Sequence, residues 1–300
     1  MSNQPPSSKP TAEPAADPSG ERIAKRLARA GLCSRRDAER WITEGRVAVN
    51  GTVLTSPAIV VAPGDQVVVD GQPLPELEPT RLWRYHKIEG LVTTARDEKG
   101  RSTVFSHLPP DMPRVISVGR LDLTTEGLLL LTNDGELARF LELPSTGWPR
   151  RYRVRVQGQA NPVKLQGLAR GVTIEGVKYG PIEVTVDRQQ NSNAWLTVTL
   201  REGKNREVRR VMESQGLMVN RLIRVAYGPF QLGKLVRDAV EEVPRRVLND
   251  QLQAFFATRP QAGAPAPAST TLSLPSAPSR KPGTTAKPAP ARGNHAHHRR

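Results

Sequence analysis

The chain has 300 residues, a hydrophobic fraction of 37% and a net charge of +15 at pH 7. This length accommodates one or two compact domains with additional end segments. The positive excess favours a polyanionic partner, because Lys and Arg that neutralise phosphates release condensed counterions. Charge alone does not separate nucleic acid from an anionic membrane surface. However, residues 1–20 lack the apolar core of a signal peptide, and the longest aliphatic run, Leu128–Leu131, is too short to span a bilayer.

We therefore expect a cytoplasmic protein without membrane association, and no pattern demands more than a monomer. The end segments 1–20 and 259–300 are predicted to be disordered, because their polar, Pro-rich composition offers little apolar surface to bury. The three histidines near the C-terminus are expected to be solvated rather than metal-bound. Cys33 is the only cysteine, which excludes an internal disulfide and a cysteine-based zinc site. We expect it to be a small buried hydrophobe, and we expect no metal.

Residues 21–74 are predicted to form one compact module. Ile23, Leu27 and Ala30 recur at helical spacing before Gly31. Ser34 is a candidate N-cap for a second helix over 35–44. Strands at 46–49 and 67–69 are each followed by a turn dipeptide, Asn50-Gly51 and Asp70-Gly71. The pattern indicates two short helices followed by a small sheet.

Basic residues are concentrated on this module. Three or four residues separate successive cations of the first helix, so they share one face. Two alternatives remain at this point: a solvated face carrying ion pairs, or a surface for RNA phosphates. Few acidic residues accompany the first helix, which favours RNA contact. The cations singled out for this contact are Arg22, Lys25, Arg26, Arg35 and Arg36.

A linker is predicted at 75–80, followed by a larger domain at 81–258 with several strands and few helices. The predicted strands cover 82–86, 114–118, 128–132, 152–156, 182–186 and 195–200. The predicted helices cover 135–143, 162–169, 205–214 and 248–257. Because strands and helices do not alternate strictly, we expect an α+β fold with a largely antiparallel mixed sheet.

Three motifs in this domain contain groups that carry chemistry. The segment 119–127 places Asp122 just before an apolar strand, either as a turn residue or as a carboxylate on a rigid support. Asp134 is a candidate helix cap. In the segment 150–156, alternation places Tyr152 on one strand face and the arginines on the other. The segment 202–210 is typical of a turn entering a basic helix, where a buried arginine is able to pair with Asp122 and keep it ionised.

Together these motifs resemble the B-type family of pseudouridine synthases that act on small- or large-subunit ribosomal RNA. The resemblance rests on the segments 119–122 and 127–135, on Gly203-Lys204-Asn205-Arg206-Glu207-Val208-Arg209-Arg210, and on 221–224 with Gly228-Pro229. Residues 21–70 resemble the S4 RNA-binding domain that commonly precedes this family's catalytic domain. The match covers roughly residues 21–250 in the family's order. One departure is Lys87-Ile88-Glu89-Gly90, where the family usually has Lys-Pro-x-Gly.

The resemblance implies a role for particular residues. Asp122 aligns with the catalytic aspartate, Tyr152 with a tyrosine that stacks on the target base, and Arg209 with a basic residue that pairs with the aspartate. Leu222 aligns with an apolar pocket residue. Arg120 is expected to help displace the target base, and Lys204 to contact substrate.

The implied reaction converts uridine to pseudouridine in ribosomal RNA, free or in a pre-ribosomal particle, and 23S is favoured over 16S. No cofactor is expected, because the reaction involves no redox change. Whether Asp122 attacks the sugar, attacks the base or removes a proton stays open. The alternative is a non-catalytic S4-domain RNA-binding protein that assists ribosome assembly. A protein of the membrane surface is disfavoured, because residues 22–29 form too short an amphipathic segment.

Overall fold

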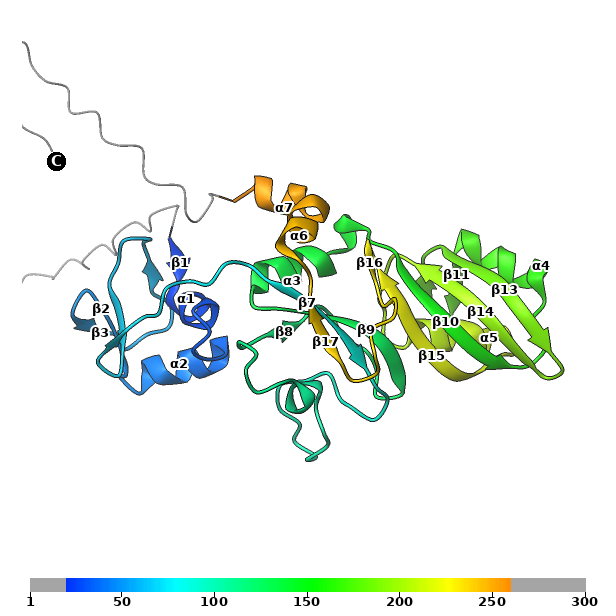
Figure 1. The fold of residues 1–300 in the computed structure, drawn as a ribbon, viewed down its shortest axis with the longest axis horizontal. Helices are drawn as coiled ribbons and strands as arrows, with labels where there is room; N and C mark the ends of the chain where they lie inside the picture. The colour runs from blue at the N-terminus through cyan, green and yellow to red at the C-terminus, as the bar shows by residue number, and fades with distance from the viewer. Residues whose placement is uncertain (1–19, 260–300) are drawn as a thin grey trace, which may run out of the picture. The chain divides into compact units, whose positions relative to one another are not determined.

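The computed structural model describes residues 20–259, and everything below concerns these residues (Figure 1). The two end segments predicted to be disordered, 1–20 and 259–300, lie outside the described residues except for Gly20 and Arg259. In this part of the chain no helix is long and apolar enough to cross a membrane.

The N-terminal module contains the two expected helices and a small sheet. Helix α1 spans Ile23–Arg29 and α2 spans Arg35–Thr43, and the Ser34 hydroxyl accepts a hydrogen bond from the Asp37 amide at 3.1 Å as the N-cap. The helices pack on a four-stranded sheet of order β3-β2-β5-β6. These strands are β2 (Val47–Val49), β3 (Thr52–Val53), β5 (Val67–Val69) and β6 (Gln72–Pro73), while β1 (Glu21–Arg22) pairs with β4 (Val60–Val61).

Local sequence accounts for the turns of this module. Asn50 and Asp70 both adopt a positive φ ahead of a glycine, as a two-residue hairpin of the predicted type requires. Cys33 lies in the module's apolar core, and burial raises the pKa of its thiol to about 11. The prediction of a small buried hydrophobe at this position is therefore confirmed.

The larger domain is built on a nine-stranded sheet whose main path runs β13-β14-β10-β15-β9-β7-β17. Among these pairs only β15 and β9 are parallel, so the expected α+β fold with a largely antiparallel sheet is confirmed. The strands are β7 (Leu82–Lys87), β8 (Ile116–Ser117), β9 (Thr125–Thr132), β10 (Arg150–Gln157), β13 (Ile182–Gln190), β14 (Asn193–Leu200), β15 (Met218–Tyr227), β16 (Phe230–Gln231) and β17 (Val240–Glu242). A separate hairpin pairs β11 (Val172–Ile174) with β12 (Val177–Tyr179).

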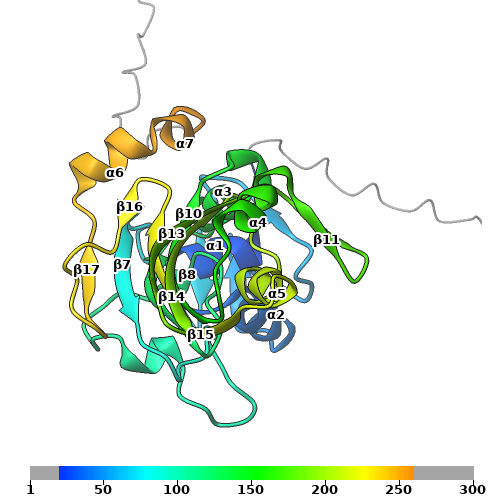
Figure 2. The same cartoon turned by 90° about the vertical axis from the view of Figure 1, so that its right-hand side faces the viewer.

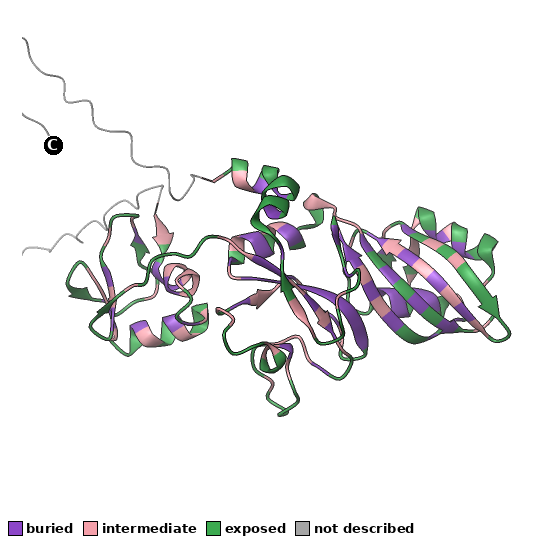
Figure 3. Ribbon diagram, in the orientation of Figure 1, coloured by how far each residue is buried: buried purple, intermediate pink, exposed green. Residues whose placement is uncertain are grey.

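Two apolar cores lie against this sheet. Helices α4 (Pro162–Gln166) and α5 (Glu207–Ser214) lie on the same side of β13, β14, β10 and β15 (Figure 2). Along β10 and β14, buried residues facing these helices alternate with more exposed ones (Figure 3). A second core joins β7 and β9 to α3 (Gly135–Glu142), α6 (Arg245–Gln251) and α7 (Gln253–Ala257).

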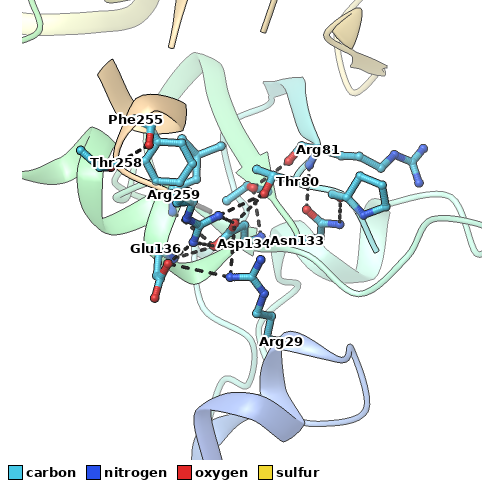
Figure 4. Close-up of polar contacts among 12 residues, drawn as sticks. Arg29, Thr80, Arg81, Asn133, Asp134, Glu136, Phe255, Thr258 and Arg259 are labelled. Atoms are coloured by element: carbon cyan, nitrogen blue, oxygen red, sulfur yellow. Dashed lines mark hydrogen bonds and ion pairs between the residues drawn. The ribbon is translucent and has the colours of Figure 1, made fainter. Parts of the chain in front are cut away.

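The start of α3 is fixed by Asp134, whose carboxylate accepts hydrogen bonds from the amides of Glu136 (2.9 Å) and Leu137 (3.4 Å). The prediction of Asp134 as a helix cap is confirmed. Figure 4 shows Arg259 reaching this carboxylate from the end of α7, and Arg29 of α1 approaching it at 4.0 Å. Arg259 was expected to begin the disordered tail, but it packs on Phe255 and pairs with Asp134 and Glu136.

Candidate active site

A cavity of about 870 Å³ opens between the loop before β9, strands β10 and β15, and the segment that enters α5. Five of the residues expected at the site line this cavity: Arg120, Asp122, Tyr152, Lys204 and Leu222. They come from four separate regions of the sequence. The fold therefore brings together side chains that are up to 102 residues apart in the sequence, as Arg120 and Leu222 are.

The strand register explains how Tyr152 and Leu222 reach the cavity. Leu222 faces Val154 across the antiparallel β10–β15 pair and Thr125 across the parallel β15–β9 pair. Tyr152 lies one inward position before Val154 on β10, on the face that carries the buried residues. Both side chains are therefore fixed by the sheet rather than by a loop, which keeps their positions precise.

The Asp122 loop is held through its backbone. Lys87 is fully buried at the end of β7, and its Nζ donates to the carbonyls of Asp122 (3.2 Å) and Thr125 (2.9 Å). The Gly90 amide, at a φ of +90°, donates to the Leu123 carbonyl at 2.8 Å, and the Thr93 hydroxyl donates to the Leu121 carbonyl at 2.9 Å. Burial lowers the pKa of Lys87 to about 8, an effect that nearby carboxylates, Asp122 first, oppose.

Arg209 belongs to the same support rather than to the cavity wall. Its guanidinium donates to the carbonyls of Val219 (3.1 Å) and Thr124 (3.0 Å). The expected direct ion pair with Asp122 is not formed within the described residues: the terminal nitrogens of Arg209 contact backbone carbonyls instead, and its Nε atom has no partner there. Burial lowers the pKa of Arg209, while the negative charge of Asp122 raises it. The two charges therefore interact across the loop that Arg209 holds.

Asp122 differs from the other carboxyl groups that line the cavity. Glu142 accepts a hydrogen bond from the Gly119 amide (2.6 Å), Glu202 from the Gly180 amide (2.6 Å) and Glu207 from the Lys204 amide (2.8 Å). The Asp122 carboxylate has no comparable protein partner within the part of the chain that the structure describes. It is half-buried.

Two cavity residues were missed by sequence reasoning. Arg150 was expected on the outward face of β10 with the other arginines, but it is buried and lines the cavity with Arg224. Arg150 donates to the Arg201 carbonyl (2.7 Å) and to the Tyr227 hydroxyl (2.9 Å), whereas the Nη2 atom of Arg224 has no partner in the described chain. Strict alternation along 150–156 places Arg150 on the same strand face as Tyr152. The sequence pattern was therefore sufficient to predict that Arg150 faces the core.

The cations predicted on the N-terminal module divide into two groups. Arg22, Arg35 and Arg36 are exposed. Lys25 forms ion pairs with Glu21 and with Glu136 of α3. Arg26 donates to the carbonyls of Ala62 and Pro63, both at 3.2 Å, so its guanidinium is engaged within the module.

A free carboxylate on a restrained loop, an aromatic ring and a basic wall are features expected of an enzyme that acts on a nucleic acid. The family model of RNA pseudouridylate synthases matches residues 81–214, and that of the S4 domain matches residues 21–67. A Rickettsia felis protein named an uncharacterized RNA pseudouridine synthase is 46% identical over 222 residues, which are 74% of this chain and 96% of that protein.

Ribosomal large subunit pseudouridine synthase B is also similar to this chain. The Haemophilus influenzae protein of this name is 45% identical over 230 residues, which cover 74% of this chain and 64% of its own length. A solved pseudouridylate synthase shares the fold, with a TM-score of 0.56 at 22% identity over 77% of this chain and 99% of that one. The chain therefore belongs to the RNA pseudouridine synthase family, and it is an isomerase with an N-terminal S4 domain.

Proposed function

We propose that the protein converts a specific uridine of ribosomal RNA to pseudouridine, with Asp122 as the catalytic carboxylate. The observation that carries this proposal is that Asp122 alone among the cavity's carboxyl groups has no protein partner in the described chain. The name of the similar large-subunit enzymes favours 23S over 16S RNA as the substrate. The cavity wall also suits a polyanion, because the buried cations Arg150 and Arg224 line it.

The reaction breaks the bond between N1 of uracil and C1′ of the ribose and forms a bond between C5 and C1′. The C5 proton is lost and N1 gains a proton, so the product is an isomer and no oxidant or reductant is consumed. A cofactor is therefore not required by the balance of the reaction. The target base must first leave its stack, at a cost of roughly a few kcal/mol.

Tyr152, which lines the cavity, is proposed to stack on the extruded base, and such stacking contributes about 1–3 kcal/mol. Leu222 supplies an apolar wall, and Arg120 and Lys204 supply positive charge at the cavity. Arg209 acts through the loop as a positioning residue, because its hydrogen bond to the Thr124 carbonyl holds the segment that presents Asp122.

We also propose that residues 21–74 are an RNA-binding domain, joined by a linker at 75–80 to a catalytic domain at 81–258. The exposed residues Arg22, Arg35 and Arg36 are its remaining free contacts for phosphates. The protein is proposed to act as a cytoplasmic monomer on ribosomal RNA or a pre-ribosomal particle. A purely RNA-binding assembly factor is disfavoured, because such a protein has no need of a free carboxylate on a supported loop.

The test replaces Asp122 with asparagine, and Asp111→Asn is the matched control because Asp111 is an exposed carboxylate outside the cavity. Unmodified 23S and 16S RNA are incubated with each protein, and pseudouridine is mapped and quantified. We expect Asp122→Asn to bind 23S RNA like the wild type and to form no detectable pseudouridine, while Asp111→Asn stays fully active. Activity retained by Asp122→Asn would refute the assignment.

A further inference from the structure

A second basic surface lies on the sheet face opposite α4 and α5. We call this surface the outer arginine face and define it by Arg151, Arg153 and Arg155 of β10, Arg188 of β13 and Arg221 of β15. All five side chains are exposed. The three arginines of β10 point away from the core, because they alternate with the buried residues Tyr152, Val154 and Val156 that face α5.

The register of the sheet places part of this surface in one row. Arg155 faces Trp195 of β14 on one side and Arg221 of β15 on the other, and Trp195 in turn faces Arg188 of β13. Three arginines and a tryptophan thus follow one another across four adjacent strands. Neighbouring strands are about 4.8 Å apart, so the row is a short, rigid line of cations.

Few carboxylates balance this charge. Arg153 approaches Asp187 at 4.0 Å and stacks over the Trp195 ring, with its Cζ 5.0 Å from the ring centroid. Glu126 is buried and is shared by Arg221 (2.7 Å) and by the exposed Arg237 (2.9 Å). Arg151, Arg155 and Arg188 form no ion pair within the described residues. The surface therefore keeps a strong positive excess.

The use of arginine rather than lysine on this surface also favours a phosphate ligand. Every cation on β10, β13, β14 and β15 is an arginine, and these strands contain no lysine. A solvated surface has no requirement for arginine, whereas a guanidinium binds phosphate through two parallel hydrogen bonds. The residues contribute little to the core, because the apolar side chains of these strands face the opposite side.

We propose that the outer arginine face binds the phosphate backbone of the RNA substrate at a distance from the target uridine. The identification of the partner as RNA rests on the proposed function, whereas the surface itself is defined by the strand register and by its charge. The cavity holds the extruded nucleotide on one side of the sheet, and the outer arginine face holds a neighbouring segment of the folded RNA on the other. It thereby adds affinity for large, structured RNA without taking part in the chemistry.

The test uses the full chain with three substitutions on the central strand, Arg151→Gln, Arg153→Gln and Arg155→Gln. A matched control removes three exposed cations elsewhere, through Lys234→Gln, Arg245→Gln and Arg246→Gln. Binding of unmodified 23S RNA is measured by filter retention over a series of KCl concentrations. Each lost phosphate contact reduces the slope of log K against log salt by about 0.7–0.9.

We expect the β10 variant to bind at least tenfold more weakly at low salt, with a slope that is shallower by about 2, while the control stays within twofold of the wild type. Its kcat for pseudouridine formation at saturating RNA should be unchanged. Equal affinity and slope for the two triple variants would overturn the proposal. A β10 variant that loses affinity only for vesicles rich in anionic lipid, and not for RNA, would overturn it as well.

The readout separates this proposal from the proposed function. RNA affinity is measured without reference to product, so the outer arginine face is tested even if Asp122→Asn proves active. Conversely, an unchanged affinity of the β10 variant leaves the assignment of Asp122 untouched.

Discussion

The Asp122 side chain is free because other residues hold its backbone. Lys87, Gly90, Thr93 and Arg209 all donate to carbonyl groups of residues 121–125, and none of these hydrogen bonds occupies the Asp122 carboxylate. A loop restrained in this way presents a reactive group in a fixed position without neutralising it. Two buried cations beneath the loop also supply positive charge near the carboxylate. The resemblance to the family predicted a catalytic role for Asp122. It did not reveal that hydrogen bonds to backbone carbonyls hold the loop of Asp122 in place.

Glu207 permits a pH-dependent test at the edge of the same cavity. It is almost fully buried at the start of α5, and burial together with the neighbouring Glu202 raises the pKa of its carboxyl group. Burial also raises the pKa of Glu202, but hydrogen bonds and Lys204 outweigh that effect and lower it overall. One proton is therefore held on Glu207 in the folded protein at pH values where the unfolded chain has lost it.

Because the folded-state pKa of Glu207 lies above its unfolded value, this group lowers the free energy of unfolding progressively as the pH rises above about 4.5. Glu207→Gln retains an acceptor for the Lys204 amide and removes the titration. We expect the variant to gain stability relative to the wild type as the pH rises from 5 to 8, by at least about 2 kcal/mol, since each unit of the pKa shift corresponds to about 1.4 kcal/mol. Urea unfolding at four pH values measures the difference, with the exposed Glu213→Gln as the control. A difference that does not vary with pH would contradict the assignment.

The contact between β9 and β15 aligns the Asp122 loop with the cavity wall. These strands form the parallel pair in the sheet, and Gly127 of β9 faces Arg224 of β15. A Cβ at residue 127 would lie 2.3 Å from the Arg224 carbonyl oxygen, and the φ of Gly127 is +100°. Only glycine therefore allows the two backbones to approach so closely at this point.

We expect Gly127→Ala to destabilise the protein by more than about 2 kcal/mol, because backbone on both strands must move to relieve the clash. Activity should fall further than stability alone accounts for, since β9 leads directly out of the Asp122 loop. Thermal unfolding and pseudouridine formation at a temperature well below the transition test both statements. Gly167→Ala is the control, because Gly167 has helical angles and open space around its Cβ position. Comparable behaviour of the two variants would show that the close approach is not required.

Sequence patterns predicted most elements of the sheet but not the strand that organises it. The strands at 82–86, 128–132, 152–156, 182–186 and 195–200 are present, several of them extended by a few residues. The central strand β15 was missed because its polar and apolar residues do not alternate cleanly. Its pairing with β10 contains two register shifts, and it carries the buried Arg224. A cation normally indicates a solvent-facing position, so Arg224 conceals the buried face of this strand.

The observed helix boundaries differ from the predicted ones for local reasons. The helix predicted to start at 205 begins at Glu207, because Arg206 has a φ of +51° and ends the preceding turn. The helix predicted at 248–257 is two helices, α6 and α7, which meet at Leu252 with a φ of −118°. The predicted strand at 114–118 is reduced to Ile116–Ser117, where it pairs with the end of β9. Propensity indicates such elements, but tertiary packing sets where each one ends.

At the scale of the whole molecule, we propose that RNA recognition is distributed over the N-terminal module, the cavity and the outer arginine face. The contacts of Lys25 and Arg29 with Glu136 are partly exposed ion pairs, and such pairs contribute about 0–1 kcal/mol each. The second core, by contrast, is formed within residues 82–255. The catalytic domain therefore does not depend on the N-terminal module for its own packing.

A variant lacking residues 1–74 should consequently stay folded and lose RNA affinity. We expect its circular dichroism and cooperative unfolding to be preserved, and its Kd for unmodified 23S RNA to rise at least tenfold. In the full chain, joint replacement of the exposed Arg22, Arg35 and Arg36 by glutamine should reproduce most of that loss, if phosphate contacts are the reason for it. The Asp111→Asn protein serves as the folded control with unchanged binding. Undiminished RNA affinity after the deletion would show that the S4 domain has another task, and a loss not reproduced by the three substitutions would assign recognition to its shape rather than to these charges.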